Sequence, residues 1–168
     1  MRQITIQSLQ HETFAPFGMY AQMNQPEGYA LTGALHAFYP DRVQVPATGS
    51  LYGFSTITVN RPPRMVIDQV EYHTTTGELI LGLNDDMVLH VAPPSGGIPV
   101  PQHTCAFLVP RLTLIYLRPA VWHLAPLPAN APQLTAMIAL PVCTYANDCT
   151  VCELDEQDRF ELVFPRQD

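Results

Sequence analysis

Seventeen prolines are distributed along the whole of this 168-residue chain. Proline has no backbone N–H to donate and fixes φ, so it ends or kinks an α-helix wherever it falls in the interior. Long helices therefore have little room. The best helical candidate is a short segment over residues 10–14, which Pro16 and Gly18 would end. We expect the chain to be built mainly from strands.

Alternating apolar and polar residues predict several short strands. The clearest covers residues 64–73, and the other candidates are residues 78–83, 87–92, 112–117, 133–140 and 159–164. Many short strands without intervening helices predict an all-β barrel or sandwich. Residues 19–50 are expected to form an irregular strand-and-loop excursion. Residues 148–168, with seven acidic residues against two arginines, are expected to form a solvated final strand and tail.

Composition limits the partners that this chain can have. Hydrophobic residues make up 47%, enough for a sizeable core, and the length predicts a single domain over residues 1–168. Lysine is absent, which excludes a Schiff-base lysine and a P-loop lysine. The net charge of −7 would repel phosphate backbones, so we predict no nucleic-acid partner.

The chain shows no sign of export or membrane insertion. Its start lacks the apolar core of a signal peptide, and no stretch reaches the roughly 18 apolar residues of a membrane span. Four cysteines are too sparse for a disulfide scaffold. We therefore expect a cytoplasmic protein with reduced thiols and no membrane partner.

One cluster of ionisable residues stands out, with the spacing Glu71-x-His73-x4-Glu78. Residues i and i+2 of a strand point to the same face, so Glu71 and His73 are expected to project together. Gly77 permits a tight turn that would bring Glu78 back toward them. Their face starts apolar at Met65 and Ile67, which predicts a barrel interior with a polar pocket at one end.

Other candidates each have two interpretations. His123, which follows Trp122, is either a fourth ligand or a buried histidine bonded to a backbone carbonyl. Arg118 is either a clamp for a substrate carboxylate or part of a salt bridge at the rim. Cys149 and Cys152 form a lone Cys-x2-Cys, a weak zinc or redox signal, and Cys149 is more simply a packing residue. His90 is most simply a strand histidine on the less apolar face.

Glu71-x-His73-x4-Glu78 and Pro119-x3-His123 resemble the two metal-binding motifs of the cupin superfamily. Within that superfamily, the chain most resembles the ureidoglycolate lyase family. The matching segments span most of the chain in the family's order; they are residues 9–18, 59–61, 70–73, 116–123 and 147–149. This resemblance implies an all-β cupin-like double-stranded β-helix barrel with an irregular N-terminal extension, and a homodimer.

The resemblance also implies a small-molecule substrate and a carbon–nitrogen lyase that releases urea and glyoxylate from ureidoglycolate. Glu71 or His73 would be the base, His123 the acid, and Arg118 the carboxylate clamp. A divalent metal on Glu71, His73, Glu78 and His123 is the other possibility, and this donor set suits Mn, Fe, Ni or Zn. Two alternatives stay open: a divalent-metal cupin enzyme acting on another small oxo or hydroxy compound, and a small-molecule-binding cupin without catalysis.

Overall fold

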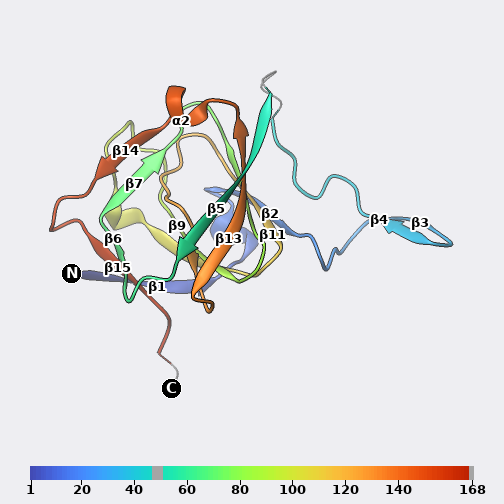
Figure 1. The fold of residues 1–168 in the computed structure, drawn as a ribbon, viewed down its shortest axis with the longest axis horizontal. Coiled ribbons are helices and arrows are strands. Elements are labelled where there is room, and N and C mark those ends of the chain that lie inside the picture. Colours follow the sequence, from blue (N-terminus) through green and yellow to red (C-terminus); the bar gives the residue numbers. More distant parts are fainter. Residues whose placement is uncertain (47–50, 167–168) are drawn as a thin grey trace.

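The computed structural model describes residues 1–46 and 51–166 and shows a β barrel with two main sheets (Figure 1). The first sheet has the strand order β12-β9-β10-β1-β15-β6. Its members are β1 (Arg2–Ser8), β6 (Met65–Ile67), β9 (Met87–Val91), β10 (Cys105–Val109), β12 (Leu127–Pro128) and β15 (Phe160–Val163).

The second sheet has the order β2-β11-β8-β13-β5. Its members are β2 (Gly18–Gln22), β5 (Tyr52–Asn60), β8 (Glu78–Gly82), β11 (Thr113–Leu117) and β13 (Gln133–Pro141). Two strand pairs stand apart from these sheets: β7 (Gln69–Tyr72) with β14 (Thr150–Glu153), and β3 (Leu31–Gly33) with β4 (His36–Phe38). The helical elements are single turns: α1 (His11–Phe14), a 3-10 turn η1 (Pro101–His103) and α2 (Thr144–Asn147).

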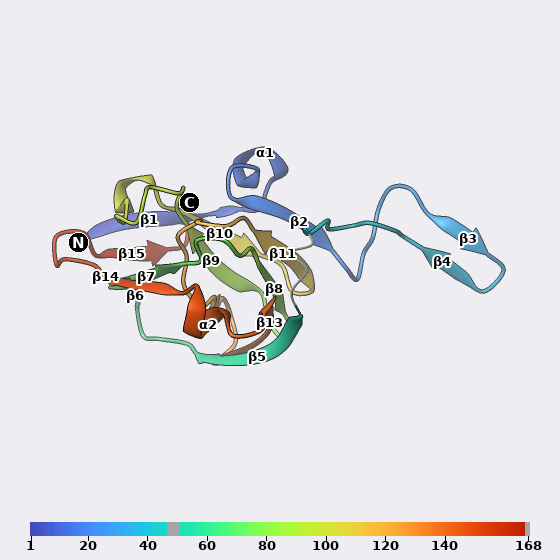
Figure 2. The same ribbon diagram turned by 90° about the horizontal axis from the view of Figure 1, so that it is seen from above.

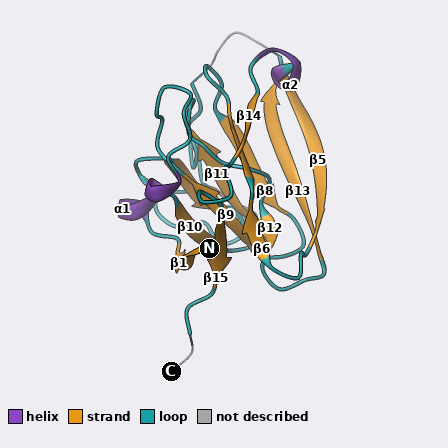
Figure 3. Ribbon diagram, turned by 90° about the vertical axis from the view of Figure 1, so that its left-hand side faces the viewer, coloured by secondary structure: helices purple, strands orange, loops and turns teal. Residues whose placement is uncertain are grey.

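The chain passes repeatedly between the two sheets. It leaves β8 for β9 and β10 in the first sheet, and then returns to β11 and later β13 in the second (Figure 3). Residues 121–123 bridge β7 and β9 through the isolated pairs Glu71–His123 and Ala92–Trp122. This path is that of a double-sheet jelly roll, the barrel type of cupins. The predicted all-β, cupin-like fold class is therefore confirmed.

Two apolar clusters fill the structure on opposite faces of β9. The first core lies between the sheets and includes Leu89, Phe107 and Ile138, with Phe14 of α1 also packed into it. The second core lies beneath β1, β15 and β6 and includes Phe160 and Trp122. Because every residue of β9 is buried, this strand is an almost continuous apolar run rather than an alternating one.

His90 lies in a strand, as predicted, and Val88 and Ala92 flank it on its face of β9. That face is buried too, so His90 is only 2% exposed. Its ring stands edge-on to Phe160, with the ring centroids 5.8 Å apart. Both faces of β9 are covered, so alternation along the strand does not separate a wet side from a dry side.

The predicted strand over residues 64–73 is broken into β6 and β7 at Asp68. Met65, Ile67 and Val70 all belong to the second core, and the three-residue step from Ile67 to Val70 reverses the alternation. The expectation that Met65 and Ile67 share a face with Glu71 and His73 was therefore wrong.

The C-terminal segment was also misjudged as solvated. Leu154, Phe160 and Leu162 are buried in the second core. Strand β15 lies between β1 and β6, pairing parallel with the first and antiparallel with the second. The acidic residues of this segment alternate with these core residues, so its acidic composition does not show that it is solvated. Residues 167–168 lie outside the described residues.

The region expected to be irregular has two parts. Strand β2 belongs to the barrel, whereas residues 24–46, here called the arm, project from it and carry the β3–β4 hairpin (Figure 2). The predicted short helix over residues 10–14 is confirmed as α1. The four cysteines are free thiols, as predicted. None of the helices in the described residues has the length and apolar character needed to cross a bilayer.

Candidate metal centre

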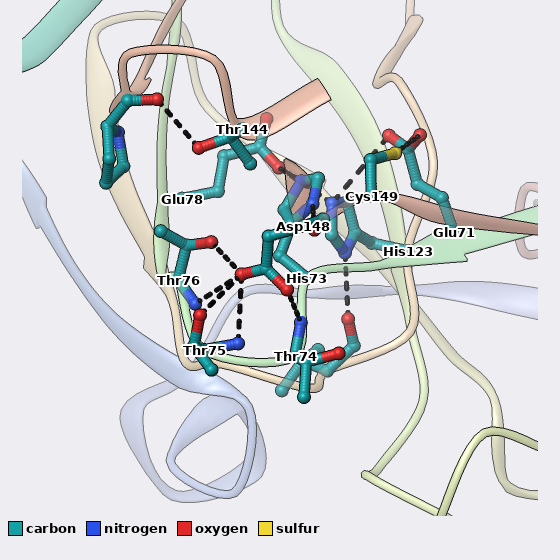
Figure 4. A network of polar contacts seen from close by, with 12 residues as sticks. Glu71, His73, Thr74, Thr75, Thr76, Glu78, His123, Thr144, Asp148 and Cys149 are labelled. Atoms are coloured by element: carbon teal, nitrogen blue, oxygen red, sulfur yellow. Dashed lines mark hydrogen bonds and ion pairs between the residues drawn. The ribbon is translucent and has the colours of Figure 1, made fainter. Parts of the chain in front are cut away.

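Four side chains named by the sequence analysis meet at one end of the barrel (Figure 4). Glu71 lies in β7, His73 just after it, Glu78 opens β8, and His123 lies in the bridging segment. The backbone N–H of Glu71 donates to the carbonyl of His123 at 2.7 Å, and the N–H of His123 donates back at 2.9 Å. This antiparallel pair puts the two residues directly opposite each other.

The turn over residues 74–77 returns the chain to the same point. A Cβ at Gly77 would overlap the ring of Tyr116, so any other residue here would force that ring to shift. The turn places the Glu78 side chain, only 4% exposed, between the two histidines. The Glu78 Oε2 atom lies 2.7 Å from Nε2 of His123 and 3.4 Å from Nε2 of His73.

Glu71 completes the cluster from its outer side. Its Oε1 atom lies 3.9 Å from Nε2 of His123, and its side chain is 14% exposed, more than those of the other three. One ligand-type atom from each of Glu71, His73 and His123 lies within 4.8 Å of the other two.

Glu78 and His123 form a buried ion pair. Burial alone would raise the pKa of Glu78, but the charge and hydrogen bond of His123, together with His73, lower it to about 2. Burial alone would lower the pKa of His123, but Glu78 outweighs burial and raises it. The carboxylate and the imidazolium therefore stabilise each other in a buried site.

Backbone carbonyls fix the orientation of both imidazole rings. Nδ1 of His73 lies 2.9 Å from the carbonyl oxygen of Asp148, and Nδ1 of His123 lies 2.8 Å from that of Val121. A carbonyl oxygen only accepts, so each Nδ1 carries the proton and each Nε2 points into the cluster. Nε2 of His73 is buried and has no hydrogen-bond partner.

These features fit a divalent metal. Metal-binding histidines commonly donate one ring N–H to a carbonyl or carboxylate, which leaves the other nitrogen to bind the ion. Two imidazole nitrogens with two carboxylates suit Mn, Fe, Ni or Zn better than Ca. His73, with its unpartnered nitrogen, is the clearest sign that the cluster is built to hold a further group.

A short segment with α2 covers this end of the barrel. The carboxylate of Asp148 accepts the backbone N–H of Thr74 at 2.8 Å, and those of Thr75 and Thr76 at 3.0 Å. It also accepts the hydroxyl groups of Thr75 and Thr76. Burial would raise the pKa of Asp148, but these hydrogen bonds lower it to about 2. Asp148 thus ties α2 to the turn that positions Glu78, while its own carbonyl holds His73.

Two further residues reach the cluster from this segment. The ring of Tyr145 stands edge-on to His73 at a centroid distance of 6.0 Å. The thiol of Cys149 donates to Oε2 of Glu71 at 3.5 Å, a contact that its interpretation as a packing residue did not foresee. The sequence analysis missed Asp148 and Tyr145, since nothing in their local spacing links them to residues 71–78. Only the family resemblance over residues 147–149 drew attention to this segment.

Arg118 does not join the cluster. Its guanidinium donates to the carbonyl oxygens of Ala15 and Pro16, at the end of α1. No hydrogen bond or ion pair among the described residues links it to Glu71, His73, Glu78 or His123. The expected carboxylate clamp is therefore not part of this site, because α1 holds the arginine side chain elsewhere.

Comparisons with known proteins do not show a family for this chain. No family model matches the chain, and no curated protein matches it. A solved dTDP sugar isomerase from Desulfovibrio desulfuricans G20 is similar with a TM-score of 0.49 and 12% identity, over 85% of this chain and 89% of that one.

RmlC from Streptococcus suis, solved in complex with dTDP-D-xylose, is similar with a TM-score of 0.40 and 8% identity. That match covers 55% of this chain, which spans only 44% of the RmlC chain. Both similarities are too distant to carry an argument about function, which therefore rests on the geometry of the cluster.

Proposed function

We propose that Glu71, His73, Glu78 and His123 bind a divalent metal, and that the protein is an enzyme acting on a small oxo or hydroxy compound. The observation that carries this proposal is the orientation of the two histidines. Both are buried, both have Nδ1 fixed by a backbone carbonyl, and both aim Nε2 at the same carboxylate. Such preorganised donors are typical of metal centres.

The charge of the cluster supports a cation rather than an acidic substrate as its direct ligand. Glu71 and Glu78 contribute carboxylates, and Asp148 adds a third close by. Within the described residues no arginine bonds to this group, so an anion entering it unaided would meet repulsion. A bound metal ion would offset the negative charge of these carboxylates, so that an oxygen-bearing substrate could bind.

A divalent ion bound here would act as a Lewis acid on a carbonyl or hydroxyl oxygen of the substrate. Glu71, the most exposed of the four side chains, would bind the metal through one carboxylate oxygen and accept a proton from the substrate through the other. Burial and the nearby Glu78 and Glu71 raise the pKa of Tyr145, so its phenol stays protonated and can donate a hydrogen bond to a substrate oxygen.

Ureidoglycolate is the first substrate to test, on the strength of the sequence resemblance. Its collapse to glyoxylate and urea requires removal of a hydroxyl proton and protonation of the departing nitrogen. Glu71 would take up the hydroxyl proton and return it to the departing nitrogen as the carbon–nitrogen bond breaks. A coupled glyoxylate assay tests this reaction directly. Turnover of other small hydroxy or oxo compounds, with ureidoglycolate inert, would support the metal enzyme and reject the lyase.

The metal itself is tested by elemental analysis of protein purified with Mn, Fe, Ni or Zn. We expect one ion per chain in the wild type and its loss in the His73→Ala and His123→Ala proteins, with the barrel still folded by circular dichroism. The matched control is His103→Ala, since His103 is an exposed histidine of η1.

Thermal unfolding separates a ligand from a structural histidine. At a hundredfold excess of metal over its Kd, binding adds about 3 kcal/mol to the free energy of unfolding, and the ligand variants lose this increment. Unchanged metal content with a lower midpoint in His123→Ala would remove His123 from the ligand set. Metal-free wild-type protein under all four loading conditions would reject the centre altogether.

A further inference from the structure

A cavity of about 200 Å³ lies between α2 and the inner side of β5 and β13, where β13 ends and β5 begins (Figures 1 and 3). Ile138 and Leu140 form its floor, and both are buried members of the first core. Ser55 and Val142 also line it and are exposed. The cavity therefore runs from solvent to the apolar interior of the barrel.

Strand register places this cavity on the same inner side of the sheet as Glu78. Strands β8 and β13 pair so that Ile80 opposes Ile138, and both side chains belong to the first core. Two residues further along each strand, Glu78 and Leu140 point to the same inner side. Gly53 of β5 pairs with Leu140 and lines the cavity. One strand, β13, therefore separates the cavity edge at β5 from the strand that carries Glu78.

Tyr145 borders both the cavity and the metal cluster. Its side chain lines the cavity, and its ring stands edge-on to that of His73 at a centroid distance of 6.0 Å. Nε2 of His73 is the buried nitrogen that lacks a hydrogen-bond partner. A ligand in the cavity is thus one side chain away from the cluster.

The cavity offers apolar surface and hydroxyl groups. Ile138, Leu140 and Val142 supply the apolar surface, and Ser55, Thr144 and Tyr145 supply hydroxyl groups. Over residues 1–46 and 51–166, no charged side chain lines it. A charged group would enter without a counter-ion, at a considerable cost in free energy. A methylene chain would instead gain free energy by leaving water.

The volume of the cavity limits the ligand to a small one. A cavity of about 150 Å³ is large enough to hold benzene, so this one holds roughly six to eight non-hydrogen atoms.

A second cavity, of about 250 Å³, lies across the same segment and is built differently. It is bordered by Thr75, Thr76 and Asp148, whose polar groups already bond to one another. Of the described residues, neither Tyr145 nor any member of the first core lines it. It therefore offers a ligand no apolar floor and no contact with Tyr145.

We propose that the cavity beside Tyr145 binds the tail of the substrate, and that the substrate is a small oxo or hydroxy compound with an uncharged aliphatic chain of about four to six carbons. The oxygen-bearing end of this compound lies at the metal, and its chain lies against Ile138 and Leu140. The inference rests on the proposed metal centre and names the substrate class for it.

Straight-chain hydroxamic acids are suitable probes, because they bind a metal through two oxygens and carry an uncharged chain. Their affinity for metal-loaded protein is measured by calorimetry, starting from acetohydroxamic acid. Each added methylene should tighten binding about fourfold, up to a chain of about six carbons. A probe of equal length whose chain ends in a carboxylate should bind at least about tenfold more weakly.

Gly53→Val fills the cavity from the side of β5. A Cβ at Gly53 would meet Cγ1 of Val142 at 3.6 Å, an ordinary contact, so the variant should fold. It should bind acetohydroxamic acid as the wild type does and lose the gain from longer chains. Ser55→Leu, at an exposed position of the cavity, is a second filling variant if Gly53→Val fails to fold. Thr56→Val is the matched control, since Thr56 follows Ser55 in β5 and points to the opposite face.

The outcomes separate the cavity from the metal centre. Metal-loaded protein that binds acetohydroxamic acid but gains nothing from a longer chain would overturn the substrate class and leave the metal centre intact. An equal gain in the wild type and in the filling variants would do the same. Protein that holds no metal and binds none of the probes would overturn both proposals. Methyl NMR signals of Ile138 and Leu140 should shift with the six-carbon probe and not with acetohydroxamic acid, and signals unmoved by both would place the chain outside the cavity.

Discussion

Two buried histidines in neighbouring parts of this barrel have opposite ionisation. His90 in β9 is packed in the second core, where burial, reinforced by the charge of His123, lowers its pKa to about 3. His123 is equally buried, yet Glu78 raises its pKa. Burial disfavours the charged form of both rings, and a carboxylate 2.7 Å away reverses this effect for one of them.

The polar partners of the two rings differ in the same way. His123 has partners at both nitrogens, Val121 and Glu78. Nε2 of His90 is buried without a partner, and its ring contacts Phe160. Depth in the barrel therefore does not identify a functional histidine. A functional histidine is identified instead by two features: the hydrogen bonds that orient its ring, and the carboxylate that the ring faces.

Glu78→Ala should have the largest effect, because it removes the carboxylate that distinguishes His123 from His90. It leaves His123 buried without its carboxylate, so the pKa of His123 should fall below its usual value of about 6.5, as that of His90 does. Removing one partner of a buried ion pair costs about 3–5 kcal/mol. Urea unfolding of metal-free protein at pH 7 measures the loss, and NMR titration follows the His123 ring. Glu156→Ala, at an exposed carboxylate, is the control.

A fall of less than about 1 kcal/mol for Glu78→Ala, with the titration of His123 unchanged, would contradict the ion pair. Acid should act in the same direction in metal-free wild-type protein. The pKa of Glu78 is about 2 when folded and about 4.5 when unfolded, so its contribution to stability is lost as pH falls through this interval.

His90 should make the protein sensitive to milder acid. Its folded pKa is about 3, so the unfolded state takes up a proton below pH 6.5 while the folded state does not. Stability therefore falls as pH decreases from 6.5 toward 3, by about 2 kcal/mol between pH 7 and pH 5. His90→Leu should remove this slope and leave stability at pH 7 unchanged or higher, since it deletes an unsatisfied buried polar group.

Urea unfolding at pH 7 and pH 5 gives the slope for both proteins. The His123 ion pair remains in both, and its raised pKa has the opposite consequence: its contribution is fully present below about pH 6.5 and is lost as pH rises through the folded value. Equal slopes in wild type and His90→Leu would show that His90 is protonated in the folded protein.

Asp148→Asn should lower the stability of the polar end of the barrel by a smaller amount. The variant keeps the backbone carbonyl that orients His73 but weakens the carboxylate's bonds to Thr74, Thr75 and Thr76. Losing a charge-assisted acceptor of this kind costs about 1–3 kcal/mol. Metal affinity, measured by calorimetry, should fall about tenfold.

Hydrogen exchange over residues 142–149 should also accelerate in Asp148→Asn. Asp155→Asn, at an exposed aspartate, is the control. If Asp148→Asn exchanged as slowly as the wild type and kept its metal affinity, the carboxylate would not be what holds α2 in place.

Cysteine reactivity gives the smallest and finest test. Burial and the nearby Glu71 raise the pKa of the Cys149 thiol to about 11, whereas Cys143 is exposed. Alkylation of the native protein at pH 8 should therefore modify Cys143 first, since the thiolate is the reactive form. Glu71→Gln should accelerate the modification of Cys149 several-fold. Peptide mapping by mass spectrometry follows both sites, and denatured, unreduced protein should yield four thiols.

Much of the architecture could be predicted from the sequence. Prolines exclude long helices, and short strand-like segments, most of them bounded by Gly, Pro, Asn or Asp, located β8, β9, β11, β13 and β15 to within a residue or two. The pairing of Glu71 with His73 on one face follows from strand geometry alone, and Gly77 signalled the turn that returns Glu78. These inferences hold because they depend on neighbours along the chain.

The remaining features depend on which segments meet in space. Asp68 interrupts the alternation, and only the packing of Val70 into the second core reveals it. Asp148 and Tyr145 reach the site from a distant segment, and α1 draws Arg118 away from it. His90 lies between two layers, where polar and apolar positions are both buried. The local sequence pattern determines which face of a strand a side chain points to. The layer that packs against that face comes from distant parts of the chain, and it determines the side chain's charge and chemistry.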